Sequence, residues 1–190
     1  MSLDHILLGI LREPAAGYDI KQQFEQVFNH FWYADLAQIY RSLNRLEKGG
    51  LLRSRIEPSD RGPDRKVYRR TAQGTQALDK WLRGGPVFGS EKFAYLAQAF
   101  FLGHLHDTEA SEEFFTTLRE ELVAKLEALV AIEQGWKAEC GRGFPDVLDD
   151  AEFHEYLTLD MGLRKTRALV DWADNALVQL RGRAKSKRKT

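Results

Sequence analysis

DLAQIYRSLNRLEK (residues 35–48) decides the fold, because its apolar residues recur at intervals of three and four. This spacing places Leu36, Ile39, Leu43 and Leu46 on one face of a helix, with Asp35 as its expected N-cap. The opposite face carries cationic and amide side chains, namely Gln38, Arg41, Asn44, Arg45 and Lys48. The segment therefore predicts an amphipathic helix with a positively charged outer face.

The residues after this helix predict a β-hairpin. Gly49-Gly50 ends the helix, residues 51–57 form a short strand, and residues 65–70 (RKVYRR) return as a second one. The tip between them, PSDRGPD (residues 58–64), consists mostly of turn formers. A helix with a cationic face suits the major groove of a DNA duplex, and an arginine-bearing tip suits the phosphates beside it. The pattern predicts a winged helix-turn-helix.

Three further helices complete the expected N-terminal domain. Apolar periodicity predicts helices over residues 3–12, 18–28 and 72–83, with a break at 13–17 and Thr71 as a cap. The glycine- and proline-containing stretch 84–90 predicts a joint between domains. We therefore expect a DNA-binding domain over residues 1–85.

The second half of the chain shows only helical patterns. Residues 92–105 are rich in aromatic side chains, and 109–139 and 152–180 carry apolar residues in near-heptad spacing. The two long helices can pair with each other within one chain. However, Leu126 and Val130 on one helix, and Phe153, Leu157, Leu169 and Trp172 on the other, widen the apolar surface. This surplus favours a homodimer through residues that include Leu118, Leu122, Leu129, Leu159, Leu163, Val170 and Leu177.

The expected fold class is mainly α with a small β-hairpin. It combines an N-terminal winged helix-turn-helix with a C-terminal α-helical dimerisation domain over residues 86–181. Residues 182–190 are predicted to form a disordered basic tail that either skims DNA phosphates or only aids solubility.

Charge is distributed unevenly although its formal sum is zero. Residues 38–83 contain 12 Lys and Arg against 5 Asp and Glu, whereas residues 86–180 contain 8 against 18. A basic region joined to an acidic one indicates that the first half meets a polyanion. The single Cys140 excludes an internal disulfide, and the short apolar start, interrupted by Asp4 and His5, predicts neither a membrane span nor a signal peptide. We expect a cytoplasmic protein.

Motifs in the first 83 residues resemble those of the PadR family of bacterial winged-helix transcriptional regulators. They are LLGIL (7–11), GYDI (17–20), QIY (38–40), Leu43, Leu46-Glu47, GLL (50–52), and Tyr68 with Thr71 at the end of the wing. The helical remainder is similar in length and character to the longer subfamily, which dimerises through C-terminal helices. The resemblance implies a dimer on an inverted-repeat operator, most often a repressor, and in some members release by a small aromatic compound such as a phenolic acid.

The chain departs from the family pattern at a few positions. Asp35 replaces a Ser or Thr, Ala37 a Gly, and Arg41 a Pro, while Arg70 stands where an apolar residue is usual. Asp caps a helix as Ser does, whereas Arg41 places a long cation at the middle of the outer face. These changes leave the fold in place and alter the operator sequence that we expect.

The candidate DNA contacts lie on the helix and the wing. Gln38 and Asn44 can read adenine edges, and Arg41 or Arg45 guanine edges. Lys48 is a further cation of the same face, and the phosphate or minor-groove candidates at the wing are Arg61, Arg65 and Lys66. Tyr18 and Tyr40 either contact phosphate or edge the core, and the family pattern favours contact for Tyr40.

Other classes of function fit less well. No catalytic triad or glycine-rich phosphate loop is present, so we expect no enzyme and no cofactor. His104 and His106 could begin a metal or redox-sensing site with Cys140 or His154, and a winged helix used only for protein contact is the other alternative. The aromatic residues are more often core than pocket, but a small planar effector would need walls such as Phe93, Phe100, Trp136 and Trp172.

Overall fold

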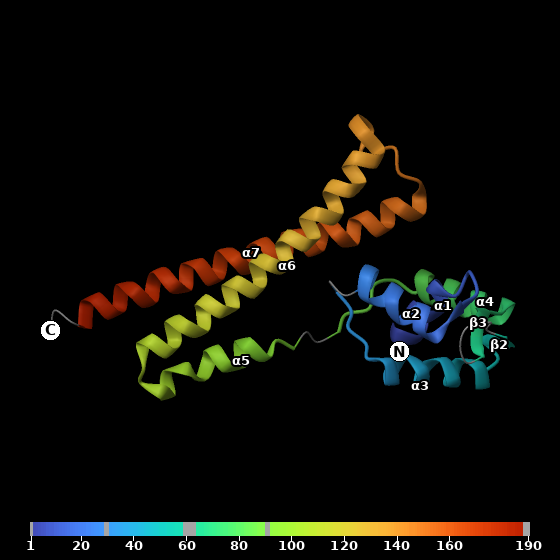
Figure 1. Cartoon of the computed structure of the whole chain (residues 1–190), viewed down its shortest axis with the longest axis horizontal. Helices are drawn as coiled ribbons and strands as arrows, with labels where there is room; N and C mark the ends of the chain where they lie inside the picture. The colour runs from blue at the N-terminus through green and yellow to red at the C-terminus, as the bar shows by residue number, and fades with distance from the viewer. Residues whose placement is uncertain (1, 29–30, 59–63, 90–91, 188–190) are drawn as a thin grey trace. The chain divides into compact units, whose positions relative to one another are not determined.

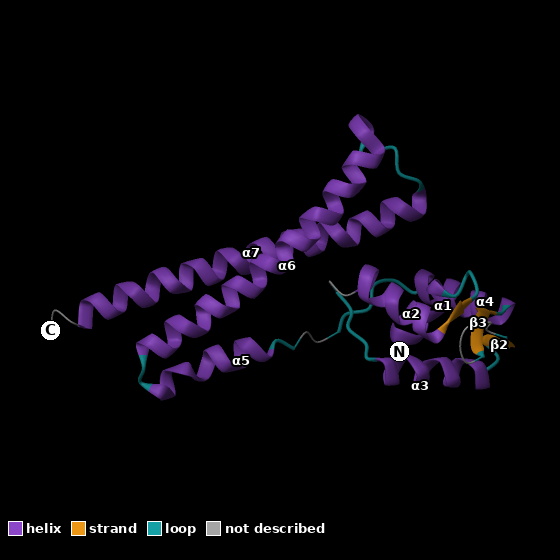
Figure 2. Cartoon of the chain, in the orientation of Figure 1, coloured by secondary structure: helices purple, strands orange, loops and turns teal. Residues whose placement is uncertain are grey.

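The computed structural model describes residues 2–28, 31–58, 64–89 and 92–187 (Figure 1). The chain forms two compact units, Met1–Gly89 and Ser90–Thr190. The first is a mixed unit with a small sheet, and the second contains helices only among its described residues (Figure 2). The mainly α fold with a winged helix-turn-helix is confirmed.

The first unit follows the predicted order of elements. Its helices are α1 (Ser2–Ile10), α2 (Gly17–Gln23), the π-helical turn η1 (Phe24–Phe28), α3 (Leu36–Lys48) and α4 (Ala72–Arg83). Thr71 caps α4, because its hydroxyl oxygen accepts a hydrogen bond from the Gly74 amide at 3.0 Å.

The sheet has three antiparallel strands in the order β1–β3–β2, one more than the expected hairpin. Strands β2 (Leu52–Glu57) and β3 (Arg65–Arg70) form the wing, and β1 (Ala15–Ala16) adds to the free edge of β3. We expected residues 13–17 only to break the first helix. Two residues are too few to show a strand period, so β3 supplies the pairing that defines β1.

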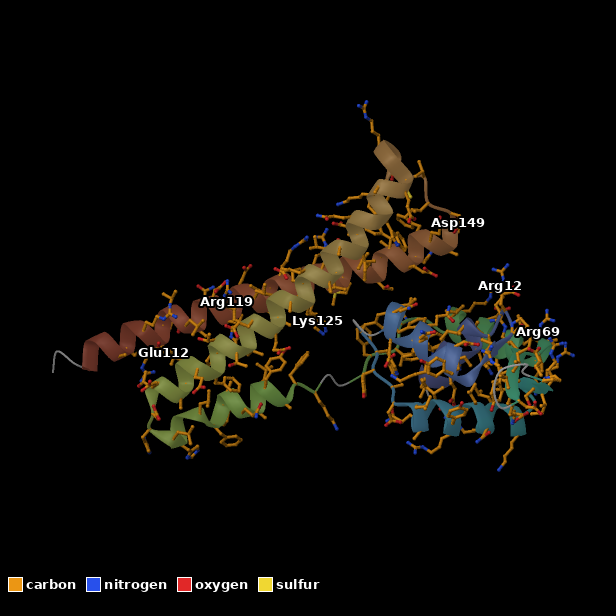
Figure 3. The ribbon with its side chains drawn as sticks, in the orientation of Figure 1. Arg12, Arg69, Glu112, Arg119, Lys125 and Asp149 are labelled. Carbon is orange, nitrogen blue, oxygen red and sulfur yellow. The ribbon has the colours of Figure 1, made fainter. Side chains whose placement is uncertain are left out.

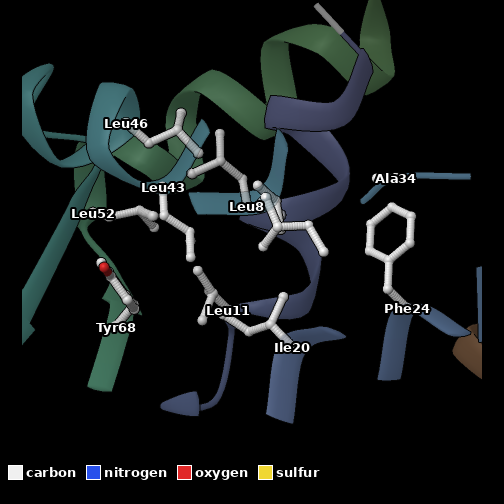
Figure 4. Packing of buried hydrophobic residues seen from close by; sticks show 11 residues of the cluster. Leu8, Leu11, Ile20, Phe24, Ala34, Leu43, Leu46, Leu52 and Tyr68 are labelled. Carbon is white, nitrogen blue, oxygen red and sulfur yellow. The ribbon is translucent and has the colours of Figure 1, made fainter. Parts of the chain in front are cut away.

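The core of the first unit draws on every helix before the wing and on the wing itself (Figure 4). Leu7, Leu8 and Leu11 from α1 and its end meet Ile20, Phe24, Ile39, Leu43, Leu46, Leu52 and Tyr68, all at most 3% exposed. Of the four apolar residues expected inside α3, Leu36 is instead 41% exposed. Leu36 is the first residue of the helix and lies outside the set of residues that the core covers.

The second unit consists of α5 (Ala94–Phe101), α6 (Thr108–Cys140), α7 (Asp150–Lys187) and the short 3-10 turns η2 (Leu102–Leu105) and η3 (Gly141–Gly143). Helices α6 and α7 pack along each other (Figure 1). Leu122, Leu129, Leu159, Leu163 and Leu177 are 1–7% exposed in the single chain. These five residues, expected at a dimer contact, therefore already form the intrachain α6–α7 seam, while Leu118 and Val170 are half-buried.

The basic C-terminal segment also differs from the expectation. Helix α7 continues to Lys187, six residues beyond Arg181, where we expected disorder to begin. Ala, Arg and Lys are good helix formers, and cations near a helix C-terminus interact favourably with its dipole. Residues 188–190 lie outside the described part of the chain. Among the helices that the structure describes, none has an apolar stretch long enough to cross a membrane.

Candidate nucleic-acid interface

Helix α3 is fixed at both ends by local hydrogen bonds. At its start, the Asp35 carboxylate accepts from the Gln38 amide at 2.7 Å, and Gln38 Oε1 accepts from the Asp35 amide at 3.1 Å, which makes a capping box. At its end, Gly50 adopts φ 71° and the Leu51 amide donates to the Leu46 carbonyl at 2.9 Å. This left-handed turn favours glycine and directs the chain into the wing.

The outer face of α3 is accessible as the sequence predicted. Gln38, Arg41, Asn44 and Lys48 are all exposed. Gln38, Arg41 and Arg45 line a hollow of about 280 Å³, together with Leu3, Ser42, Trp32 and Tyr33. Tyr33 is 76% exposed and was not among the predicted contacts, because it lies in the irregular segment before the helix. The hollow places amide, guanidinium and phenol donors close to one another.

Two of the predicted base readers already have partners. Gln38 Oε1 belongs to the capping box, which leaves its amide nitrogen as the outward donor. Arg45 donates two hydrogen bonds to the carboxylate of Asp4 of α1, from Nη2 to Oδ1 at 2.5 Å and from Nε to Oδ2 at 3.2 Å. Its Nη2 also donates to the Ser42 hydroxyl. The hydrogen bond to Asp4 raises the pKa of Arg45. Arg41 and Lys48 have no carboxylate partner among the described residues, so they are the exposed cations of this face that make no ion pair there.

The wing is attached to α3 through Glu47. Its carboxylate accepts hydrogen bonds from Lys66 Nζ of β3 at 2.7 Å and from the Ser54 hydroxyl of β2. The hydrogen bond from Lys66, followed by that from Ser54, lowers the pKa of Glu47, and the same contact raises the pKa of Lys66. Lys66 therefore acts first as a tie between the wing and the helix, a role that its position in the sequence did not reveal.

The remaining predicted contacts are distributed around α2 and the wing. Arg65 Nη2 lies 2.5 Å from Asp19 Oδ2, and Asp19 also accepts from the Ala16 amide. Arg61 lies outside the described residues. Tyr18 is 66% exposed, whereas the Tyr40 ring packs on Gly17 so closely that a Cβ there would lie 2.5 Å from its hydroxyl oxygen. Tyr40 thus edges the core and keeps 39% of its surface exposed.

The sheet carries cations that the sequence argument passed over. Arg53 and Arg55 of β2 and Arg69 of β3 are exposed and line a groove with Pro14, Ser54 and Val67. The sequence did offer a signal for this group, because Arg53 and Arg55 are alternate residues of one strand and must share a face of the sheet. Arg69 joins them from the neighbouring strand.

The four aromatic residues proposed as one effector pocket do not meet within one chain. The Trp172 ring packs with Tyr95 and Phe115, at centroid distances of 6.4 and 5.4 Å, and Phe93 adjoins Tyr95. Trp136 is 21 residues along α6 from Phe115, and so about 30 Å away at 1.5 Å per residue, and it lies near Tyr156 instead. Phe100 is 81% exposed and packs on Phe101. Helical periodicity gave the face of each residue but not its partner on the next helix.

The described residues bring no three His, Cys, Asp or Glu side chains together in a way that could hold a metal ion. The alternative of a metal-based sensor built on His104, His106, Cys140 and His154 therefore has no geometric support in this part of the chain.

Comparison with known proteins identifies both units. Residues 6–80 match the model of the transcriptional regulator PadR-like family, and residues 95–181 match the virulence activator alpha C-terminal domain. A probable transcriptional regulator of Mycobacterium tuberculosis is 29% identical over 185 residues, covering 92% of this chain and 95% of that protein.

The negative transcriptional regulator PadR of Bacillus subtilis is 27% identical over 180 residues, covering 94% of this chain and 97% of that protein. Its crystal structures with operator DNA and with p-coumaric acid match this chain with TM-scores of 0.78 and 0.70, each covering 95% of this chain and 99% of that chain. The Vibrio cholerae virulence activator AphA, also 27% identical, matches with a TM-score of 0.70 and covers 95% of this chain and 98% of that chain.

Proposed function

Since the chain belongs to the PadR-like family of transcriptional regulators, which are not enzymes, we propose that it is a cytoplasmic, homodimeric repressor of a neighbouring gene. It binds an inverted-repeat operator and releases it when a small aromatic effector binds. The observation that carries the proposal is the outer face of α3, where Arg41 and Lys48 are exposed without a carboxylate partner in the described chain. The relative crystallised with operator DNA supports this use of the same fold.

DNA contact is assigned by role. Arg41, at the middle of the face, reads a guanine edge, and Asn44 an adjacent base. Lys48, Tyr18 and Arg61 contact phosphates and fix the register. Arg45, Arg65 and Lys66 act mainly by holding the elements together through Asp4, Asp19 and Glu47.

The dimer uses the apolar surface that the α6–α7 seam leaves uncovered. Leu157 and Met161 of α7 are 47% and 56% exposed, one turn apart. Phe100, Phe101 and Leu105 add 57–81% exposed apolar side chains after and within α5. A second copy that covers these side chains removes them from water, and the two recognition helices then match half-sites about one helical turn apart.

The DNA experiment begins with selection of an inverted-repeat duplex from a random pool by the wild-type protein. On that duplex, Arg41→Ala should cost roughly 1 to 3 kcal/mol and relax the preference at one base position, because the paired hydrogen bonds to a base edge are removed. Fluorescence anisotropy at fixed salt measures this effect. Lys125→Ala, an exposed cation of α6, is the matched control and should bind as the wild type does. Equal affinity of Arg41→Ala and wild type across the selected site would contradict the assignment.

The effector is expected at the aromatic cluster of Phe93, Tyr95, Phe115 and Trp172. A hollow of about 510 Å³ lies beside it, between α5 and α6, and is lined by Tyr95, Phe114 and Leu118 among others. The structure of a relative with p-coumaric acid supports a planar phenolic ligand. Such a ligand releases DNA only if it prefers the free protein to the complex.

Titration with hydroxycinnamates and benzoates tests this assignment through tryptophan fluorescence. Trp136→Phe should keep the quenching, whereas Trp172→Phe should remove most of it, because Trp172 belongs to the cluster. Quenching that is equally strong with and without operator would exclude release by the ligand. Quenching that depends on Trp136 would place the ligand at the other end of α6.

A further inference from the structure

The three-stranded sheet has two faces of different chemistry. The inner face carries Leu52 and Tyr68, whose side chains belong to the core. It also carries Ser54 and Lys66, which donate hydrogen bonds to Glu47 of α3. Cross-strand partners in the register Arg53–Arg69 and Arg55–Val67 share the other face. This second face, formed by Arg53, Arg55, Val67 and Arg69 and called here the outer sheet face, points away from the recognition helix.

The outer sheet face forms a groove rather than a flat surface. Its volume is about 380 Å³, and it is lined by the three arginines, Pro14, Val67, which is only 8% exposed, and Ser54 of the edge strand β2. Arg12 lies at the same end of the unit (Figure 3), since the Arg70 amide donates to the Leu11 carbonyl at 3.0 Å. Arg12, next to the exposed Glu13, is therefore a further exposed cation at this end of the unit, although it does not line the groove.

Positive charge on this face is poorly compensated within the chain. Arg55 pairs with Glu57, with Nε 2.7 Å from Oε1. By the same alternation Arg65 lies on this side of the sheet, where it pairs with Asp19. Arg53 and Arg69 have no ion pair with any described residue, and neither has Arg12. Arg53 and Arg69 lie directly opposite each other, and like charges in that position destabilise a strand pair. An anion bound between them removes this repulsion.

We propose that the outer sheet face binds the phosphodiester backbone of the duplex that flanks each half-site, outside the base pairs read by α3. This inference rests on the proposed function and extends the DNA contact beyond the recognition helix and the wing tip. Guanidinium groups bind phosphate oxygens in pairs, and an open groove with exposed arms suits a backbone that passes over it. The hydrogen bonds to Glu47 hold the inner face of the sheet against α3. The outer sheet face is therefore on the opposite side of the wing from α3.

The test compares two duplexes that carry the inverted repeat selected by the wild type. The core duplex ends at the half-sites, and the long duplex adds about one helical turn of unrelated sequence, roughly 10 base pairs, at each end. The Arg53→Gln/Arg69→Gln variant removes the two opposed charges. Lys80→Gln/Arg83→Gln on α4 removes two other exposed cations of the same unit and is the matched control. Circular dichroism melts establish that each variant is folded.

The wild type and the control should bind the long duplex at least about tenfold more tightly than the core duplex at low salt. Arg53→Gln/Arg69→Gln should lose this gain but bind the core duplex unchanged. Its slope of log affinity against log salt on the long duplex should fall by roughly 0.9 for each phosphate that the variant no longer neutralises.

Two outcomes on DNA would overturn the inference: an equal loss of affinity for both duplexes, which places the arginines inside the half-site, and no loss for either. Calorimetry with inorganic pyrophosphate covers a third outcome. Tight binding that depends on Arg53 and Arg69, without a flank effect, would assign the groove to a small anion. If the wild type selects no inverted repeat at all, the proposed function fails, and this extension fails with it.

Discussion

The two units of the chain bury apolar surface in different ways. In the first unit, eleven buried apolar residues from α1, α2, α3, the wing and the segments between them form one cluster. In the second unit, the corresponding cluster contains Leu129, Leu159 and Leu163, with Leu126, Val130 and Tyr156 packed around it. The first core is closed on all sides by short elements, whereas the second is a thin seam between two long helices.

This difference teaches what each unit can do alone. A closed core supports a rigid surface, which is what recognition of base edges requires. A pair of helices buries only the facing stripe, so other apolar side chains, such as Leu157 and Met161 on α7, stay exposed. The first unit buries its apolar core within one chain, whereas the second leaves an apolar surface exposed, which is the surface that the proposed dimer would cover.

The largest effect is expected at the seam. Leu163 is 1% exposed, so Leu163→Asp buries an unpaired carboxylate and should destabilise the second unit by about 3 kcal/mol or more. We expect loss of helical circular dichroism and a lower Tm. Arg167→Asp, one turn later and exposed, is the control and should melt close to the wild type. A wild-type melt for Leu163→Asp would show that the seam is not the core of this unit.

A smaller effect separates the dimer surface from the seam. Leu157→Asp places a charge on the exposed stripe and should weaken self-association by about 2 kcal/mol, roughly 30-fold, while the helix content stays unchanged. Multi-angle light scattering across a dilution series measures this shift. Gln179→Asp, also exposed on α7, should leave the mass profile unaltered. If Leu157→Asp self-associates like the wild type, the dimer uses another surface.

The smallest effect concerns the polar tie in the first unit. Glu47→Gln weakens the bonds to Lys66 and Ser54 and should cost about 1 kcal/mol, because the pair is partly exposed. The pKa of Glu47 is lowered in the folded state, so the bridge stabilises the fold above the ordinary pKa of the carboxyl and is lost as pH falls through the lowered one. Lys66 has a raised pKa, so its contribution is complete below its ordinary pKa and is lost only as pH rises through the raised one.

Melting curves of Glu47→Gln and the wild type should therefore differ at neutral pH and converge in acid. Glu57→Gln, whose partner Arg55 lies on the outer sheet face, is the matched control, and it should give a smaller difference at neutral pH. A gap between wild type and Glu47→Gln that persists unchanged in acid would mean that the carboxylate charge does not contribute to the tie.

The sequence by itself determined the elements whose signals are local. The three-and-four spacing of Ile39, Leu43 and Leu46 gave the buried stripe of α3, and Asp35 gave its start through a capping box that involves residues three positions apart. The strands of the wing and the cap at Thr71 followed in the same way. Each of these signals involves residues within about one helical turn or one strand, so it can be recognised in the sequence without knowledge of the tertiary structure.

Tertiary structure alone decided which residues meet across the chain. Arg45 pairs with Asp4, Arg65 with Asp19, and Lys66 with Glu47, and the partners are 41, 46 and 19 residues apart in the sequence. Residues 15–16 form a strand only because they pair with the edge of β3. The leucines in heptad spacing are buried because α6 and α7 pack against each other. A periodic pattern specifies a face but not the surface that covers it, and that choice depends on how the elements pack in three dimensions.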